Sequence, residues 1–144
     1  MTGYIYCHKN KINGKVYIGQ TKNLPEIRWG KNGSNYSGQT YFYREIIKYG
    51  WDNFDHIILE KIDAKSKALL TKKLNDLEIH YIREYESMVS SKGYNTIVKD
   101  NNSYIRLTIP AKRVINKLVE EGYSFTDAYN KYKSEKQNRT QGGC

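Results

Sequence analysis

Residues 3–19 decide the fold of this chain, because they hold two tyrosine-bearing runs, Gly3-Tyr4-Ile5-Tyr6 and Val16-Tyr17-Ile18-Gly19. Aromatic and β-branched residues favour extended structure, and each run has the length of a short strand. The stretch between the runs is rich in turn residues and ends in Asn13-Gly14, a pair typical of tight hairpin turns. We therefore predict an antiparallel β-hairpin.

The pairing of this hairpin determines where the tyrosines point. If the turn spans residues 10–13, the antiparallel register sets Tyr6 directly opposite Tyr17, and both phenols leave the same face. Two converging hydroxyl groups can share a proton, because each can donate and accept. We expect the tyrosine face to stay free for chemistry. The opposite face is apolar and suited to burial, and it carries Ile5, Cys7, Val16 and Ile18.

Cap and turn residues define the elements that follow the hairpin. A short helix is predicted over 24–31, with Asn23 as its N-cap, Pro25 near its first position and Arg28 projecting from it. Three further elements are then predicted from composition and periodicity: a Gly-, Ser- and Asn-rich loop over 30–39, a helix over 40–49 that ends at Gly50, and a strand over 54–62.

A long helix is predicted from residue 64 to about residue 86, and Glu78 lies within its apolar face. Leu70, Leu74, Glu78 and Ile82 follow one another at intervals of four, and Leu77, Tyr81 and Tyr85 widen the same stripe. A carboxylate in such a place loses hydration unless a cation or hydrogen-bond donors meet it. Glu78 is therefore either paired with a neighbouring Arg or Lys, or a metal ligand.

The sequence changes character after Asn95. Residues 98–103 are polar and Asn-rich, which indicates a linker, taken to cover residues 98–109, after a domain that spans residues 1–97. Two helices are predicted within an extension over 110–134, with Pro110 and Ser124 at their N-termini. They resemble the opening of a helix-turn-helix without its recognition helix, so packing against the domain or dimerisation is favoured over reading of DNA. Residues 135–144 are polar, and we expect a disordered tail.

Composition limits the function classes. A chain of 144 residues suffices for one compact domain with an appended element. The net charge is +9, and residues 1–50 hold 8 Lys or Arg against 2 Glu, which favours a polyanionic partner over a merely soluble basic surface.

Cysteine spacing and hydropathy indicate the compartment. Cys7 and Cys144 lie at opposite ends without metal-ligand spacing, so neither a disulfide framework nor a zinc site is predicted. No stretch approaches 18 uncharged apolar residues, and no apolar signal region follows Met1. We expect an intracellular protein that neither spans a membrane nor is secreted.

The order of these landmarks resembles the GIY-YIG nuclease family over residues 3–95. The resemblance is carried by the two tyrosine runs, Arg28-Trp29, Tyr49-Gly50-Trp51, Glu78 and Gly93-Tyr94-Asn95. Tyr4 stands where the first glycine of the family motif usually falls, with Gly3 one place earlier. The resemblance implies an α/β fold, in which a small and mainly antiparallel three-stranded sheet is flanked by helices.

The resemblance also implies an active site. By position, Glu78 would hold one divalent ion, Mg²⁺ or Mn²⁺, and Arg28 would meet the phosphate of a DNA substrate. A tyrosine would act as general base. The sequence leaves open which one; we favour Tyr17, with Tyr6 as its hydrogen-bond partner. Supporting roles fall to Tyr4, Gly19, Asn32 and Asn95, and DNA contacts to Lys22, Trp29 and Lys31.

Two positions depart from the family pattern. Asn32 stands where a His or Tyr is often found, and asparagine cannot donate a proton in catalysis, although Lys31 or Tyr36 is close enough in sequence to replace it. Gln20 stands where a lysine sometimes follows the second motif. The histidines His8, His56 and His80 show no metal spacing. We interpret His8 and His80 as polar groups near the site or on the surface and His56 as an outward-facing strand residue, and we favour a structural role for each.

The leading hypothesis is a small Mg²⁺-dependent DNA endonuclease from a phage, a mobile element, or a restriction or repair system. The first alternative is a catalytically weakened DNA-binding module, motivated by Asn32 and the positive charge. A second alternative is a protein-interaction domain that uses the C-terminal helices. The sequence does not decide between a monomer and a dimer.

Overall fold

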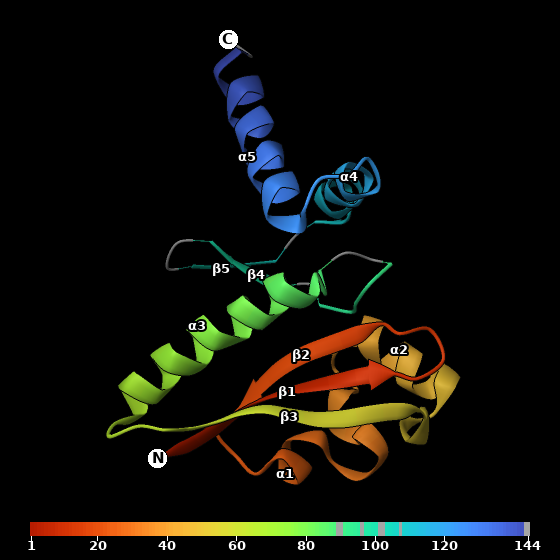
Figure 1. Cartoon of the computed structure of the whole chain (residues 1–144), viewed down its shortest axis with the longest axis vertical. Coiled ribbons are helices and arrows are strands. Elements are labelled where there is room, and N and C mark those ends of the chain that lie inside the picture. The colour runs from red at the N-terminus through yellow and green to blue at the C-terminus, as the bar shows by residue number, and fades with distance from the viewer. Residues whose placement is uncertain (89–90, 96, 101–102, 107, 143–144) are drawn as a thin grey trace.

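The computed structural model describes residues 1–88, 91–95, 97–100, 103–106 and 108–142. Its centre is a three-stranded antiparallel sheet with the strand order β2-β1-β3 (Figure 1). The strands are β1 Thr2–Asn10, β2 Val16–Thr21 and β3 Phe54–Asp63. This sheet with its flanking helices confirms the predicted fold class.

The hairpin register differs from the predicted one by two residues. Tyr6 lies opposite Gly19, and Tyr17 lies opposite His8. The turn begins later than predicted, because the amide of Asn10 still pairs with the carbonyl of Lys15 at 2.8 Å. A shift of two residues preserves the face of every side chain, so Tyr6 and Tyr17 share one face as expected.

Helix α3, Lys67–Tyr85, covers the apolar face of the sheet (Figure 1). Ser66 caps its N-terminus, with the Ser66 hydroxyl accepting a hydrogen bond from the Leu69 amide at 3.2 Å. The helix buries Leu70, Leu74 and Ile82 against the hairpin residues Ile5, Cys7, Val16 and Ile18, as predicted.

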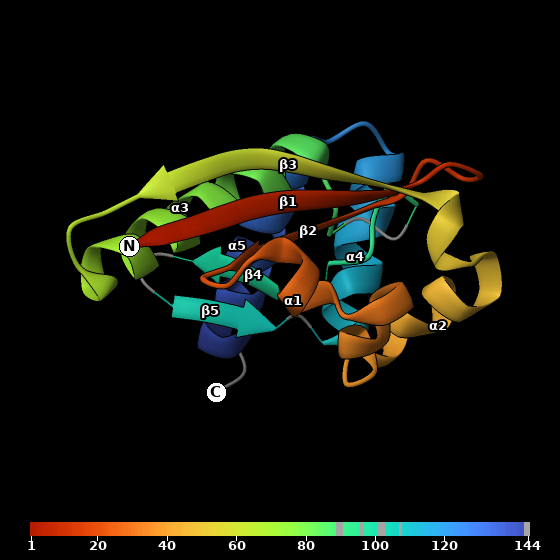
Figure 2. The same cartoon turned by 90° about the horizontal axis from the view of Figure 1, so that it is seen from below.

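The tyrosine face is covered as well, which corrects the expectation that it stays free. Four short elements lie against it, as Figure 2 shows from below for α1 and α2. They bury a second, aromatic cluster that includes Tyr6, Tyr36, Phe42 and Tyr94. Aromatic side chains bury large areas, which explains why so many tyrosines face inward. The four elements are α1 Pro25–Trp29, η1 Lys31–Tyr36, α2 Thr40–Tyr49 and η2 Trp51–Asn53.

The start of α1 and the predicted loop both differ from expectation. Leu24, and not Asn23, is the N-cap of α1 and makes no side-chain cap, whereas the Asn23 amide binds the Thr21 hydroxyl at 3.0 Å. Pro25 takes the first helical position as predicted. Most of the predicted loop forms the 3₁₀ segment η1, in which Asn32 and Gly33 have φ values of 54° and 74°.

The region after Asn95 is more structured than predicted. The predicted linker forms an antiparallel hairpin of β4, Ile97–Asp100, and β5, Ser103–Arg106, in which Val98 lies opposite Ile105 in register. Both segments contain β-branched residues, which favour extended structure. Helix α5, Phe125–Gly142, continues through most of the predicted disordered tail; that stretch contains no proline and many good helix formers. Residues 143–144 lie outside the described part.

Helices α4, Ile109–Glu120, and α5 pack on the main core, as favoured from the sequence. Ile115 and Leu118 of α4 and Ala128 and Tyr129 of α5 belong to the same buried cluster as α3. Ser124 caps α5 as predicted, accepting a hydrogen bond from the Asp127 amide at 3.1 Å. Among the described residues, no helix has the length and apolar character needed to cross a bilayer.

Candidate active site

Tyr6 lies at the centre of the covered tyrosine face. Its ring is 1% exposed and rests directly over Gly19, where an added Cβ would come within 2.5 Å of the Tyr6 hydroxyl. The edge of the Trp29 indole packs on the same ring at 5.5 Å between centroids. The absence of a side chain at Gly19 therefore creates the place that the Tyr6 ring occupies.

Tyr6 and Tyr17 do not form the hydrogen bond predicted from the sequence. The Tyr6 hydroxyl oxygen lies 3.0 Å from that of Tyr36, and the Tyr17 hydroxyl donates to Gln39 at 2.8 Å. The shifted register explains this, since the two rings are not directly opposite each other. Burial raises the pKa of the Tyr17 hydroxyl, and the rings remain close enough that the charge of Tyr6 raises it further.

Arg28 projects from α1 toward these phenols. Its guanidinium lies 4.6 Å from the centroid of the Tyr36 ring and hydrogen-bonds the Tyr6 hydroxyl. It donates as well to the Asn35 carbonyl at 3.3 Å, which fixes the side chain to η1. Desolvation raises the pKa of Tyr6, while the positive charge of Arg28 lowers it.

Glu78 comes from α3 and lies within electrostatic reach of both phenols. Its charge raises the pKa of Tyr6 and of Tyr17. Burial raises the pKa of the Glu78 carboxyl itself to about 7, and the hydrogen bond from Gln20 lowers it by less. Within the described part of the chain Glu78 makes no ion pair with Lys or Arg, so the alternative of a buried salt bridge is not what the structure contains.

The side-chain amides of Gln20 and Asn95 hold the neighbouring backbone in place. Gln20 donates to the Asn75 side chain at 2.9 Å and so connects β2 to α3 beside Glu78. Asn95 is buried and pairs with both backbone groups of Ile18, at 2.9 Å to the amide and 2.8 Å to the carbonyl. Asn95 thus joins the end of the domain to β2.

The other predicted residues lie around this centre with fewer contacts. Tyr4 is half-buried on β1 and pairs in register with Thr21. Lys22, Lys31 and Asn32 are exposed. Trp29, predicted to contact DNA, is half-buried among the rings of Tyr6, His8, Trp51 and His56, and its indole N–H is buried without a partner.

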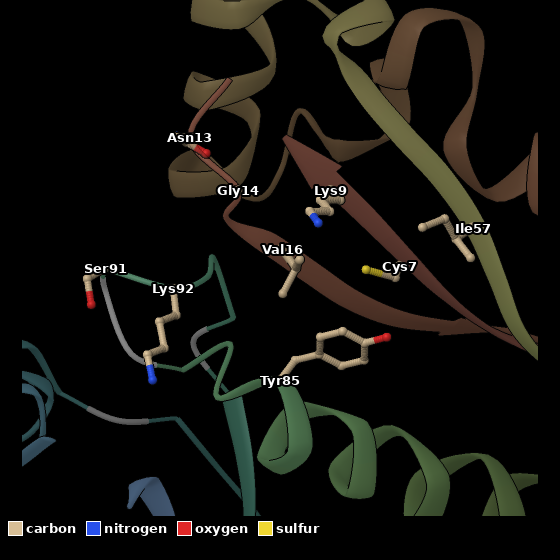
Figure 3. Close-up of a pocket in the computed structure, with 9 residues that line it drawn as sticks. All are labelled: Cys7, Lys9, Asn13, Gly14, Val16, Ile57, Tyr85, Ser91 and Lys92. Atoms are coloured by element: carbon tan, nitrogen blue, oxygen red, sulfur yellow. The ribbon is translucent and has the colours of Figure 1, made fainter. Parts of the chain in front are cut away.

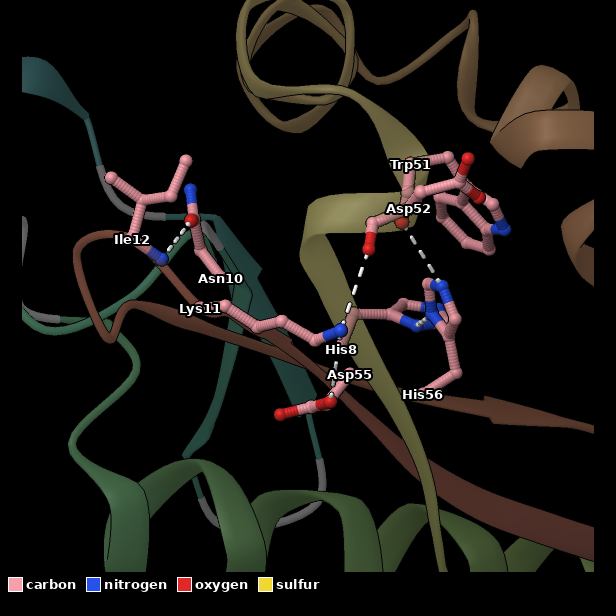
Figure 4. Close-up of polar contacts among 8 residues, drawn as sticks. All are labelled: His8, Asn10, Lys11, Ile12, Trp51, Asp52, Asp55 and His56. Atoms are coloured by element: carbon pink, nitrogen blue, oxygen red, sulfur yellow. Dashed lines mark hydrogen bonds and ion pairs between the residues drawn. The ribbon is translucent and has the colours of Figure 1, made fainter.

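Sequence reasoning placed His8 only near the site or on the surface, expected His56 to face outward, and named Tyr36 only as a replacement for Asn32. His8 is fully buried, with Nε2 2.8 Å from the Tyr36 hydroxyl and Nδ1 2.8 Å from Nδ1 of His56 (Figure 4). The alternation of a strand could have found His8, because it places residue 8 on the same face as residue 6. No local pattern could have found its partners, which lie on other elements.

A separate hollow of about 370 Å³ lies on the opposite face of the sheet (Figure 3). Cys7 and Val16 of the hairpin, Tyr85 at the end of α3 and Lys92 line it. None of the four residues predicted to be catalytic lines this hollow, so it is distinct from the tyrosine face.

The donor set at Glu78 fits a hard divalent cation. Burial removes water from around the Glu78 carboxylate, and no Lys or Arg of the described residues pairs with it. A bound cation would offset the free-energy cost of burying this charge. Mg²⁺ commonly uses one or two carboxylates and retains several waters. Among the described residues, no group of three or more His, Cys, Asp and Glu side chains gathers into a closed metal cage.

Comparison with known proteins identifies the fold. The family model of the GIY-YIG catalytic domain matches residues 2–95. A mutant of the catalytic domain of the intron endonuclease I-TevI has a similar structure, with a TM-score of 0.52 and 28% identity over 66% of this chain and 93% of that domain.

Two curated proteins match in sequence. The uncharacterized protein 019R of Invertebrate iridescent virus 6 is 33% identical over 65% of this chain and 33% of its own length. The probable intron-encoded endonuclease 1 of Neurospora crassa is 32% identical over 58% of this chain and 27% of its own length. The chain thus spans a third or less of the curated relatives it matches. The match of the family model to residues 2–95, which is more than half of the chain, shows that this chain belongs to the GIY-YIG family, with its catalytic domain in that range.

Proposed function

We propose that this protein is a metal-dependent endonuclease that hydrolyses phosphodiester bonds of DNA. The observation that carries the proposal is the convergence of Arg28 and Glu78 on Tyr6 and Tyr17, since both charges act on both phenols. Family membership and the basic N-terminal half favour the same conclusion.

Each group has a chemical task in this proposal. The Arg28 guanidinium binds a phosphoryl oxygen and stabilises the negative charge that grows there in the transition state. A phenol hydroxyl accepts a proton from the attacking water as general base. Glu78 would hold Mg²⁺ or Mn²⁺, and a bound ion would supply stabilisation of the negative charge on the oxygens of the phosphate.

The surrounding residues position these groups. Gln20 and Asn75 orient the Glu78 carboxylate, and Asn35 orients the Arg28 guanidinium. The exposed side chains Lys22 and Lys31 contribute contacts to the DNA backbone that are independent of sequence. Such contacts weaken as the salt concentration rises.

Cleavage of supercoiled plasmid in Mg²⁺ tests the proposal. We expect wild-type protein to nick the plasmid, Glu78→Ala to remove nicking, and Arg28→Ala to slow it by roughly 100- to 1,000-fold, the loss typical of one stabilising group. Matched controls are Glu84→Ala, which alters an exposed glutamate of the same helix, and Arg44→Ala, which alters an exposed arginine of α2. Both controls should cut like wild type.

The outcomes separate this proposal from its main rival. Cutting by Glu78→Ala at the wild-type rate would show that the metal assignment is wrong. Wild-type protein that shifts DNA in a gel but never nicks it, in Mg²⁺ or Mn²⁺, would favour a catalytically weakened DNA-binding module. Asn32 motivates that rival, because its exposed amide cannot serve as a proton donor.

A further inference from the structure

A chain of hydrogen bonds leads from Tyr6 through the interior to the far side of the aromatic cluster. The Tyr6 and Tyr36 hydroxyl oxygens are 3.0 Å apart, and the Tyr36 hydroxyl lies 2.8 Å from Nε2 of His8. Nδ1 of His8 lies 2.8 Å from Nδ1 of His56, whose Nε2 lies 3.3 Å from the Trp51 carbonyl (Figure 4). The chain is unbroken over four side chains and ends on a backbone acceptor.

When both histidines are neutral, the hydrogen bond between His56 and the Trp51 carbonyl determines which atom carries each hydrogen along the chain. The Trp51 carbonyl can only accept, so Nε2 of His56 carries a hydrogen and Nδ1 of His56 is an acceptor. His8 must then donate from Nδ1 and accept at Nε2, so Tyr36 donates to His8. The Tyr36 oxygen accepts in turn from Tyr6, whose hydrogen points away from Arg28. Hydroxyl hydrogens rotate freely, so the oxygen positions permit this arrangement.

A second arrangement satisfies the same contacts when His56 carries a positive charge. His56 then donates from both nitrogens, His8 donates from Nε2 to Tyr36, and Tyr36 donates to Tyr6. The two arrangements differ by one proton at each link and need no movement of the heavy atoms. The chain can therefore take up a proton at Tyr6 and deliver it at His56.

We propose that Tyr36, His8 and His56 form a proton relay that carries away the proton accepted by Tyr6 during DNA cleavage. This inference rests on the proposed nuclease function and deepens it. Tyr6 is 1% exposed, so its hydroxyl has little direct contact with solvent through which to discharge a proton. Because burial raises the pKa of Tyr6, little phenolate is present near neutral pH, and the neutral phenol can act as a base only if it hands on its own proton as it accepts one.

The proton step balances along this chain. The attacking water loses a proton to the Tyr6 oxygen as its own oxygen bonds to phosphorus and the bond to the leaving oxygen breaks. Tyr6 passes its hydrogen to Tyr36, Tyr36 to Nε2 of His8, and His8 gives its Nδ1 hydrogen to His56. The half-buried His56 releases a proton to solvent, and the leaving oxygen takes one from solvent.

The burial and the charges around His8 and His56 favour proton transfer from Tyr6 toward His56. Burial, His56 and Arg28 keep the pKa of His8 well below its ordinary value, so His8 does not retain the proton. The phenols of Tyr6, Tyr17 and Tyr36 also surround His8. Burial lowers the pKa of His56 as well, and so does Lys11, whereas the Trp51 carbonyl and the carboxylates of Asp55 and Asp52 raise it.

The aromatic neighbourhood favours His56 as the cationic site. The Trp51 ring stacks on His56 with 4.0 Å between centroids, and an indole face stabilises a cation. Lys11 is drawn away from the imidazole by its 3.7 Å ion pair with Asp55 and its contact to the Asp52 carbonyl (Figure 4). A proton that reaches His56 is thus stabilised close to solvent.

Nitrogen NMR of the histidine rings tests the relay without any substrate. Long-range ¹⁵N spectra at pH 7.5 should show His8 protonated on Nδ1 and His56 protonated on Nε2, both neutral. His8 protonated on Nε2 in that spectrum would overturn the proposal. This result does not depend on cleavage, so it stands whether or not the protein proves to be a nuclease.

Cleavage kinetics provide the second test, with His56→Ala and Tyr36→Phe as the variants. Tyr36→Phe preserves the packed ring and breaks the chain at one atom, whereas substitution of the fully buried His8 would disturb the fold. We expect each variant to cut roughly 10- to 100-fold more slowly, toward the lower end of the range for proton-transfer catalysis. Added imidazole should restore His56→Ala in proportion to the neutral imidazole present, and should leave Tyr36→Phe slow.

The control is His80→Ala, which removes an exposed histidine of α3 and should leave the rate and its pH profile unchanged. Because burial keeps the pKa of His56 below the ordinary 6.5 of histidine, wild-type rates should already be level at pH 6.5, whereas the rate of His56→Ala should continue to rise with hydroxide. Folded His56→Ala that cuts at the wild-type rate, or slow His56→Ala that imidazole does not restore, would overturn the relay. Inactive wild-type protein would instead count against the nuclease proposal.

Discussion

At the scale of single residues, Glu78 carries the strongest conflict between charge and environment. It stands in an apolar stripe of α3, and burial raises its carboxyl pKa from 4.5 to about 7. The folded chain therefore binds a proton between pH 4.5 and 7 that the unfolded chain releases. The contribution of this group to stability is greatest at low pH and is lost as the pH rises through about 7.

We predict that Glu78→Gln stabilises the metal-free protein while it removes cleavage. The amide carries no charge to desolvate, so the free energy of unfolding at pH 8 should rise by roughly 1–3 kcal/mol, and by much less at pH 4.5. Urea denaturation at both pH values measures the difference. Mg²⁺ should stabilise the wild-type protein but not the variant, because only the carboxylate binds the ion.

The matched control is Glu84→Gln, on the exposed side of the same helix. It should change the free energy of unfolding only slightly at either pH. Equal stabilisation by Glu78→Gln at both pH values would show that desolvation of the carboxylate is not the cause.

At the scale of elements, the hairpin is the unit that builds the site. Strand β2 passes directly beneath the Tyr6 ring of β1, and Gly19 is the point of contact. Packing against the Tyr6 ring thus explains why a glycine ends the second tyrosine run, Val16-Tyr17-Ile18-Gly19. It leaves room for an aromatic ring that Trp29 and Tyr36 hold from the other side.

We predict that Gly19→Ala displaces the Tyr6 ring and lowers both stability and cleavage. The new Cβ would lie 2.5 Å from the Tyr6 hydroxyl, and the packed ring has little freedom to retreat. Overpacking of this kind costs about 1–3 kcal/mol of unfolding free energy, measured by urea denaturation. Gly38→Ala is the control, since nothing lies within 4 Å of its added Cβ. Wild-type cleavage by Gly19→Ala would contradict the proposed geometry.

At the scale of the whole molecule, the C-terminal helices are part of the folded core. Ile115 is 1% exposed and lies in the same cluster as the α3 residues Leu74 and Ile82. The extension therefore shares the buried cluster to which α3, the helix of Glu78, also contributes. The sequence alone left this role open between packing and dimerisation.

We predict that Ile115→Ala destabilises the nuclease domain and not the extension alone. A fully buried isoleucine typically contributes about 2–5 kcal/mol relative to alanine. Urea unfolding is followed by the fluorescence of Trp29 and Trp51, which lie in the aromatic cluster on the other face of the sheet. The fluorescence and the helical circular dichroism signal should shift together, as one transition. Val114→Ala, at a 40% exposed neighbour, should shift it little. A separate unfolding step for the helices would contradict this prediction.

The sequence by itself determined which side chains share a face. The period of two along β1 and β2 places Tyr6 with Tyr17 and Ile5 with Ile18, and this holds although the register differs by two residues. The cap at Ser124, the position of Pro25 and the apolar stripe of α3 are likewise local properties of the chain. Local patterns suffice for them because they depend on neighbours only a few residues away.

Only the tertiary structure decided which side chains touch. Tyr6 meets Tyr36, His8 meets His56, and no Lys or Arg of the described residues pairs with Glu78, because elements distant in sequence pack around these side chains. The register of the β1–β2 hairpin depends on which residue pair closes the turn. Burial of the tyrosine face depends on the helices that pack over it. These are outcomes of competition among long-range contacts, which no short stretch of sequence encodes.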